Sequence, residues 1–117
     1  MKTERKIALC YIRVASTSAE DKVHSFEEQR QHILQLCEQN NWIPEWYEDV
    51  GGYSGMSEDD RPGFQSLRNR FTDAQVTAVV VDSLERLSRK PAHIYQFLET
   101  LEKHHIKLAV ANLERMT

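Results

Sequence analysis

The stretch KIALCYIRV, residues 6–14, decides the fold class because it is nearly continuous in apolar residues. Such a strand is buried on both faces, as in parallel sheets that helices cover on both sides. The run VTAVVVD at 76–82 is β-branched and similarly apolar. Shorter candidates are WIPEWYED at 42–49, where Pro44 favours a sheet edge, and IKLAVAN at 106–112. The sequence therefore predicts four strands.

Helical patterns separate these strands. Ser25 and Glu28 have the spacing of a capping box, which predicts a helix that opens there and ends at about Asn40–Asn41. Further helical patterns cover 61–71, 83–89 and 91–105. Alternation of strand and helix predicts an α/β domain with a mostly parallel sheet of four or more strands and helices on both faces.

Composition restricts the function. The 117 residues suit one domain, and a net charge of −3 argues against binding nucleic acid by bulk charge, so an anion site has to be local. No run has the length of a membrane span and no signal peptide is evident, so a cytoplasmic protein is expected. Cys10 and Cys37 are expected to be buried free thiols. The five histidines lack metal-ligand spacing, and no metal is expected.

Arginines follow three of the predicted strands. Arg13 ends the first strand, Arg61 closes the glycine-containing loop at 50–60, and Arg86 and Arg89 follow the third strand. In parallel sheets, sites form at the carboxyl ends of strands. Four guanidinium groups gathered there would form a phosphate clamp, because each can bind anionic oxygens with two hydrogen bonds.

A simpler interpretation pairs each arginine with a nearby acid. Glu85 and Arg89 have the i, i+4 spacing of a helical ion pair, and Asp82 and Glu85 have the spacing of another capping box. If the clamp exists, Arg13, Arg86 and Arg89 are expected to open onto one concavity, with Arg61 displaced because it borders the glycine loop. Two acids, Asp49 and Glu85, are expected within reach of these arginines.

Five short motifs give a family resemblance. They are YIRV at 11–14, SFEEQ at 25–29, YEDVGGYSG at 47–55, RPGFQSL at 61–67 and LERLSR at 84–89. In this order they resemble the catalytic domain of serine site-specific recombinases, the resolvase/invertase family. The likeness covers residue 7 to about residue 113. The sequence SFEEQ is more similar to the large serine recombinases, which include phage integrases and transposases.

The resemblance implies a reaction without metal or cofactor. A serine attacks a DNA phosphodiester, gives a 5′-phosphoserine and a free 3′-hydroxyl, and the strands are exchanged within a tetramer and rejoined. It also implies that residues 1–117 are one catalytic domain of a longer protein, which self-associates to dimers and tetramers and carries DNA-binding domains downstream. The four arginines would hold the scissile phosphate, and the residues that would line or support the site are Tyr11, Gln29, Asp49 and Ser54.

Two positions depart from the family pattern. The family usually has aspartate where this chain has Glu85, which leaves open an acid–base or an arginine-orienting role. Ala15 stands where the nucleophilic serine is expected, and Ser16 follows it. On an extended backbone the side chain of Ser16 points to the opposite face, away from the arginines, unless a bulge re-aims it. Three interpretations remain: an engineered serine-to-alanine change, a naturally inactive relative, or a nucleophile shifted to Ser16.

Two other classes of function stay open. One is a catalytically dead relative that acts as a protein–protein assembly module. The other is a small phosphate- or nucleotide-binding domain on a flavodoxin-like sheet. For the second, the segment VGGYSG at 50–55 matches neither dinucleotide-binding nor P-loop spacing.

Overall fold

The four expected strands form one parallel sheet. The computed structural model describes residues 5–14, 19–50 and 61–112. The strands are β1 (Ile7–Val14), β2 (Ile43–Val50), β3 (Val76–Val81) and β4 (Lys107–Val110). They pair in parallel in the order β2-β1-β3-β4. The predicted α/β class is confirmed, and β2 lies at an edge, as its proline indicated.

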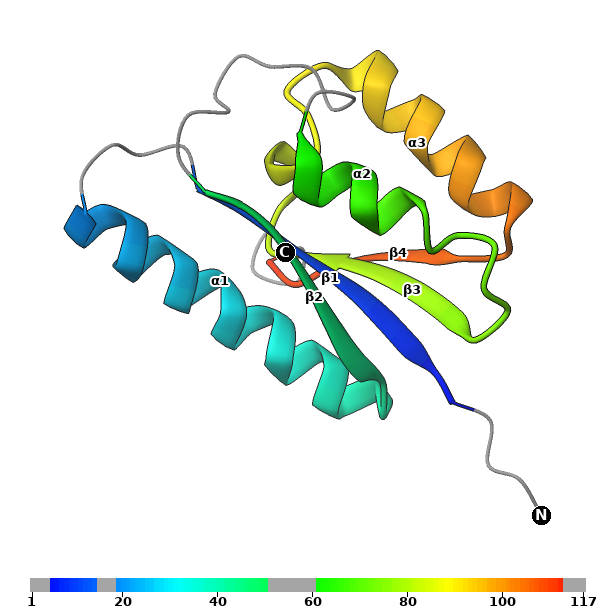
Figure 1. The fold of residues 1–117 in the computed structure, drawn as a ribbon, viewed down its shortest axis with the longest axis horizontal. Coiled ribbons are helices and arrows are strands. Elements are labelled where there is room, and N and C mark those ends of the chain that lie inside the picture. Colours follow the sequence, from blue (N-terminus) through cyan, green and yellow to red (C-terminus); the bar gives the residue numbers. More distant parts are fainter. Residues whose placement is uncertain (1–4, 15–18, 51–60, 113–117) are drawn as a thin grey trace.

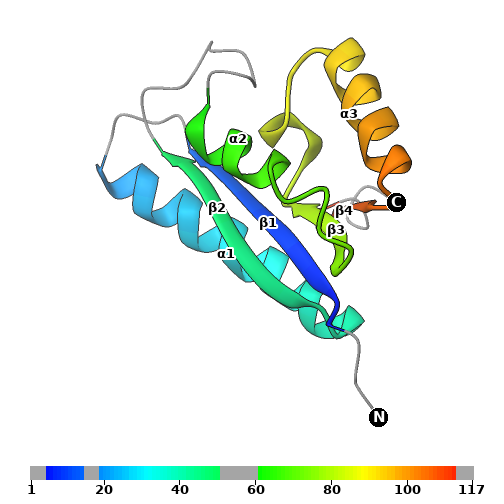
Figure 2. The same ribbon diagram turned by 45° about the vertical axis from the view of Figure 1, so that its right-hand side comes forward.

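Helices cover both faces of the sheet, as Figures 1 and 2 show. On one face lies α1 (Ala19–Asn40), and on the other lie α2 (Pro62–Arg68) and α3 (Pro91–Lys103). The predicted helical segment at 83–89 is only a short 3₁₀ helix, η2 (Leu84–Arg86), directly after β3. None of the described helices is long and apolar enough to cross a membrane.

The start of α1 differs from the prediction. The helix begins at Ala19, six residues before Ser25, so the expected capping box does not open it. The Ser25 hydroxyl instead accepts a hydrogen bond from Gln29 Nε2 at 3.1 Å, within the helix. The segment AEDKVH at 19–24 includes good helix formers, which extend the helix backward. Its end at Asn40 is confirmed, where Asn41 adopts a φ of 58° and terminates the helix.

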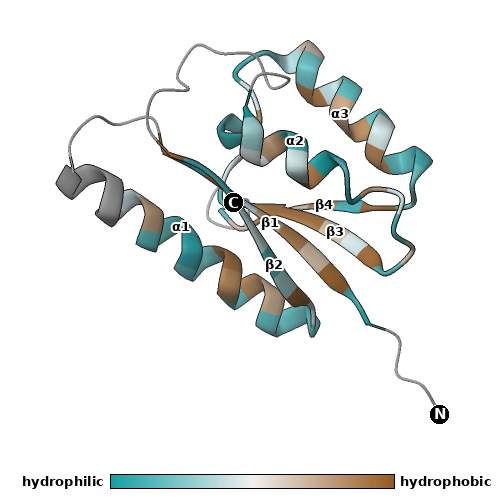
Figure 3. Ribbon diagram, in the orientation of Figure 1, coloured by the Kyte–Doolittle hydropathy of each residue, from teal (hydrophilic) through white to brown (hydrophobic). Residues whose placement is uncertain are grey.

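Alternate residues of β1 divide the core into two halves. Ile7, Leu9 and Tyr11 pack with α2 and α3, whereas the even-numbered residues of the strand pack against Ile33 and Cys37 of α1. Figure 3 shows apolar residues concentrated along β1 and β3. Both cysteines are free and buried, as expected, with 3.7 Å between the sulfur atoms of Cys10 and Cys37.

Candidate functional site

Carboxyl ends of three strands bring the candidate residues to one edge of the sheet. Arg13 lies opposite Asp49 where β1 pairs with β2, and Tyr11 lies opposite Val81 where β1 pairs with β3. The η2 turn, which follows Asp82, therefore passes beside the end of β1. This arrangement places the first arginine close to the two that follow β3.

The guanidinium group of Arg13 binds the backbone of η2. Its Nε donates a hydrogen bond to the carbonyl of Arg86 at 3.1 Å, and its Nη2 donates to the carbonyl of Glu85 at 2.8 Å. In return, Nη1 of Arg86 donates a hydrogen bond to the carbonyl of Arg13 at 3.4 Å. Two arginines thus hold each other's main chain, although their side chains carry the same charge.

Arg61 is buried within the same group, with 3% of its surface exposed. Its Nη1 donates to the hydroxyl of Tyr11 at 3.1 Å and to the carbonyl of Arg86 at 3.0 Å, and its Nη2 donates to the carbonyl of Leu87. The guanidinium also lies 5.2 Å from the ring centre of Phe64. The expectation that Arg61 is displaced from the other arginines is wrong, because these contacts lock it against η2.

Mutual repulsion shows that the charges are close. The pKa of Arg13 is lowered, first by burial and next by the positive charge of Arg61. The charges of Arg86 and Arg89 act in the same direction. We call these four residues the arginine cluster. The described hydrogen bonds of Arg13 and Arg86 go to backbone carbonyls, and those of Arg61 go to backbone carbonyls and to the hydroxyl of Tyr11. A single shared concavity stays a prediction.

Tyr11 and Asp49 form a chain of hydrogen bonds that begins at Arg61. The Tyr11 hydroxyl donates to Asp49 Oδ2 at 2.6 Å, and the same carboxylate accepts from the amides of Gly63 at 2.8 Å and Phe64 at 3.1 Å. Asp49 therefore caps the start of α2. Burial, followed by the bond to Asp49, raises the pKa of Tyr11, so this hydroxyl stays protonated. Asp49 reaches Arg61 through Tyr11.

The first turn of α2 lies close enough to β2 for Asp49 to accept these hydrogen bonds. A Cβ atom on Gly63 would lie 2.2 Å from the carbonyl oxygen of Glu48, a distance that no side chain tolerates. The family-like glycine of RPGFQSL is therefore explained by packing, because only glycine lets the first turn of α2 rest on the strand.

Gln29 fixes the backbone of Arg13. Its Oε1 accepts from the amide of Arg13 at 3.3 Å, and its Nε2 donates to the carbonyl of Arg13 at 3.1 Å. Both polar groups of the strand residue are thus bound by α1. Gln29 orients Arg13 through the main chain and leaves the guanidinium to η2.

Several predicted residues contribute differently or lie outside the described part. Glu85 is exposed, and its described contact with Arg13 uses the backbone carbonyl, so a role for its carboxylate stays a prediction. Ala15, Ser16 and Ser54 lie outside the described residues. Their places in the site, and the direction of Ser16, therefore remain predictions.

Sequence reasoning missed the carbonyl groups that hold the arginines. They belong to three consecutive residues, Glu85, Arg86 and Leu87. Every residue has a carbonyl, so no residue type marks them. The only available signal was a very short helical pattern directly after a buried strand, which predicts a turn with unpaired carbonyls. Within the described residues, no three His, Cys, Asp or Glu side chains gather to hold a metal ion.

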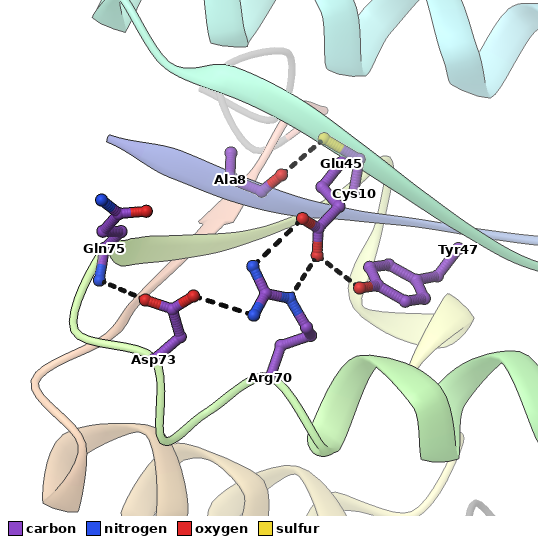
Figure 4. Close-up of polar contacts among 7 residues, drawn as sticks. All are labelled: Ala8, Cys10, Glu45, Tyr47, Arg70, Asp73 and Gln75. Atoms are coloured by element: carbon purple, nitrogen blue, oxygen red, sulfur yellow. Dashed lines mark hydrogen bonds and ion pairs between the residues drawn. The ribbon is translucent and has the colours of Figure 1, made fainter. Parts of the chain in front are cut away.

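Arg70 provides a contrasting arginine on the same face of the sheet, shown in Figure 4. Its Nε donates to Glu45 at 2.7 Å and its Nη1 to Asp73 at 2.8 Å. Tyr47 donates to the same carboxylate of Glu45, and Asp73 also accepts from the amide of Gln75 at 2.8 Å. Here two carboxylates neutralise one arginine, which is the arrangement of a structural ion pair.

Comparison with known proteins assigns the family. The family model described as "Resolvase, N terminal domain" matches residues 8–117. No curated protein matches the chain. The N-terminal catalytic domain of TP901-1 integrase is similar at 27% identity with a TM-score of 0.77, covering 92% of this chain and 79% of that one.

Two further solved structures agree. A serine recombinase from Sulfolobus solfataricus is 26% identical, with a TM-score of 0.65, covering 92% of this chain and 69% of its own. A resolvase family site-specific recombinase from Streptococcus pneumoniae, at 20% identity, a TM-score of 0.72 and coverage of 92% and 73%, shares the fold. The chain therefore belongs to the resolvase family of serine recombinases, and residues 8–117 match the model of that family's N-terminal domain.

Proposed function

We propose that this domain breaks and rejoins DNA strands by the serine recombinase reaction, with the arginine cluster holding the scissile phosphate. Family membership supports the class of reaction. The single observation that carries the site is the way in which the arginines are held. Arg13 and Arg61 both donate to carbonyls of the same short turn, η2, which gathers their guanidinium groups beside the end of β1.

An anion would relieve the repulsion within this cluster. The lowered pKa of Arg13 reflects burial and the neighbouring positive charges, which together make its charged form costly. A DNA phosphodiester brings one negative charge and two free oxygens, and guanidinium groups bind such oxygens with paired hydrogen bonds. The same groups would stabilise the additional charge that develops on the phosphoryl oxygens during transfer.

The proposed chemistry conserves the phosphodiester. A serine oxygen attacks phosphorus, the bond from phosphorus to the 3′ oxygen breaks, the serine proton leaves and the 3′ oxygen takes up a proton. The product is a 5′-phosphoserine and a free 3′-hydroxyl, and the reverse reaction rejoins the strand. Because each step exchanges one phosphoester for another, no nucleotide cofactor is needed.

Residue 15 determines whether this chain can react. Ala15 has no hydroxyl group, so cleavage requires either Ser16 or a serine restored at position 15. Odd-numbered residues of β1 face the side of Arg61 and η2, and even-numbered residues face α1. Position 15 has the same parity as Tyr11 and Arg13, which supports the family register.

Covalent capture of DNA tests the proposal. The parent chain, Ala15→Ser and Ser16→Ala are each incubated with a pool of nicked random duplexes, and DNA that resists denaturation from the protein is counted. Capture by the parent that is lost in Ser16→Ala identifies Ser16 as the nucleophile. Capture by Ala15→Ser alone identifies a catalytic domain without its nucleophile. Failure of all three chains at low salt, with DNA concentrated enough to saturate the weak binding of the domain, contradicts the proposed chemistry and favours the assembly module.

Assembly and DNA affinity form the wider part of the proposal. We infer that downstream DNA-binding domains and self-association into dimers and tetramers supply the affinity that this domain lacks. With a net charge of −3, the domain should bind duplex DNA weakly and lose that binding steeply as salt rises. Fluorescence anisotropy between 50 and 200 mM salt measures this, and tight binding that resists salt would contradict it.

A further inference from the structure

A second polar group lies at the same edge of the sheet, on the face covered by α1. Asp82 Oδ1 lies 2.6 Å from His32 Nδ1 and accepts a hydrogen bond from Asn112 Nδ2 at 3.0 Å. The carbonyl of Asp82 also accepts from the amide of Asn112 at 2.9 Å. These three residues, which we call the Asp82 anchor, belong to none of the motifs that identify the family.

The Asp82 anchor is largely buried, so its carboxylate needs hydrogen-bond donors. Asp82 is 6% exposed, and the side chain of His32 is 14% exposed. A carboxylate so far removed from water is costly unless donors bind it, and both donors come from distant segments. The contacts join α1 and the segment after β4 to the residue that follows β3. Removal of the His32 donor would therefore release this carboxylate from α1, whereas the backbone hydrogen bond from the amide of Asn112 would still join Asp82 to the segment after β4.

The anchor lies where the arginine-holding turn begins. Asp82 is the residue between β3 and the N-cap of η2, Ser83. The carbonyl of Ser83 accepts from the amide of Arg86 at 3.1 Å and so starts the turn. The following carbonyls hold Arg13 and Arg61. Any shift of the backbone at Asp82 moves these acceptors relative to β1.

One helix fixes both sides of this arrangement. Gln29 and His32 are three residues apart on α1, which places them on the same face of the helix. Gln29 binds the backbone of Arg13 at the end of β1, and His32 binds Asp82 at the end of β3. The distance between Arg13 and its carbonyl partners is thus set from α1 at two points.

We propose that His32, Asp82 and Asn112 are positioning residues that fix η2 and thereby set the geometry of the arginine cluster. Their effect on DNA cleavage rests on the proposed function, whereas their effect on the position of Arg13 does not. None of the three side chains contacts the reacting atoms in this proposal. They act on the arginines through the main chain of the turn.

Two substitutions of His32 separate positioning from simple stability. In His32→Asn the amide nitrogen occupies the place of Nδ1 and keeps a donor to Asp82. In His32→Gln the amide lies at the place of Nε2 and loses that contact. Asparagine is the poorer helix former of the two, so a purely structural effect would make His32→Asn the worse variant. The positioning role reverses this order.

The measurement is the Nε–H resonance of Arg13, whose hydrogen bond to Arg86 reports the distance between β1 and η2 without any DNA. In the parent and in His32→Asn, this proton should exchange slowly with water at the same chemical shift. In His32→Gln, exchange should become at least about tenfold faster, as expected for a hydrogen bond weakened by 1.4 kcal/mol or more. Arg70→Gln serves as a control that alters an ion pair elsewhere on the domain.

Defined outcomes decide the proposal. Equal behaviour of Arg13 in His32→Asn and His32→Gln, or a change in Arg70→Gln as large as in His32→Gln, would overturn it. If His32→Gln does not fold, Asp82→Asn replaces it, since the amide keeps the shape but presents a weaker acceptor to both donors. That variant should show faster exchange at Arg13, and an unchanged rate would also overturn the proposal. Absence of DNA capture with these results intact would count against the proposed function alone.

Discussion

Arg70 and the arginine cluster lie on one face of the sheet and are held in opposite ways. Arg70 lies against Glu45 and Asp73, and hydrogen bonds to these carboxylates raise its pKa, with Glu45 as the first cause. Arg13 lies against carbonyls of η2, and burial followed by the charge of Arg61 lowers its pKa. The same side chain is thus stabilised in its charged form at one place and destabilised at the other.

Under the proposed function, this difference separates a structural arginine from one that binds phosphate. An ion pair such as that of Arg70 has its opposite charge within the chain, so a further anion would gain little there. Carbonyl groups fix the direction of a guanidinium but leave its net charge. In the proposed function, a phosphate would bring a negative charge to the place where neighbouring positive charges lower the pKa of Arg13.

The largest expected effect comes from removing one arginine of each group. In the variant that captures DNA covalently, Arg13→Gln should reduce the rate of capture by about 10²–10³-fold, the usual effect of losing one charge-stabilising donor. Arg70→Gln should leave that rate within about twofold, because its partners lie within the ion pair. Single-turnover capture measures both. Equal losses in the two variants would show that the groups do not differ in function.

The second prediction concerns the carboxylates beside the arginines, whose removal should lower the free energy of unfolding by different amounts. Asp49→Ala removes the acceptor of Tyr11 and of two amides at the start of α2, and these donors are left buried. The free energy of unfolding should fall by about 3 kcal/mol, combining a lost cap with unsatisfied donors. Asp73→Ala, the matched change beside Arg70, should cost much less because the side chain of Asp73 is 32% exposed.

Urea denaturation at neutral pH compares the two variants. Similar midpoints for Asp49→Ala and Asp73→Ala would contradict the buried capping role of Asp49. A change in the slope of the transition, rather than in its midpoint, would indicate that two-state unfolding had failed.

Features that depend on local sequence patterns were predictable, whereas contacts between distant segments were not. The strands were predictable because runs such as VTAVVVD at 76–82 are apolar on both faces, and the ends of such strands locate a site. The arginine cluster was predictable as a gathering of charges but not in its contacts, since backbone carbonyls have no sequence signature. The start of α1 was misplaced because Ser25 and Glu28 imitate a capping box inside a continuing helix.

The Asp82 anchor was unpredictable for a different reason. His32 precedes Asp82 by 50 residues, and Asn112 follows it by 30. A lone histidine on a helix and a lone asparagine after a strand carry no spacing rule. Only the parallel register, which brings the end of β3 beside α1 and the end of β4, puts them together. The sequence suggested instead that Asp82 caps η2, whose N-cap is Ser83 without a side-chain bond.

The smallest expected effect is on the pH dependence of folding stability in acid. Hydrogen bonding to Arg70 lowers the pKa of Glu45 from its ordinary value of 4.5, and bonds from Gln75 and then Arg70 lower that of Asp73 from 3.8. Since the folded pKa values are depressed, the unfolded chain binds more protons in acid. These pairs therefore stabilise the fold fully above about pH 4.5 and lose that contribution as pH falls through the lower folded values.

Arg70→Gln should flatten this dependence, because it removes a cause of the lowered pKa in both acids. Urea unfolding between pH 3 and pH 6 would show a shallower rise of stability with pH in Arg70→Gln than in the parent chain. The difference should shrink in 1 M salt, since the pair is partly exposed and screened. Arg13→Gln provides the comparison: its described partners are carbonyls that do not titrate, so it should keep the parent's acid slope. A flattened slope in Arg13→Gln would reveal a carboxylate in the arginine cluster and would remove the distinction between the two groups.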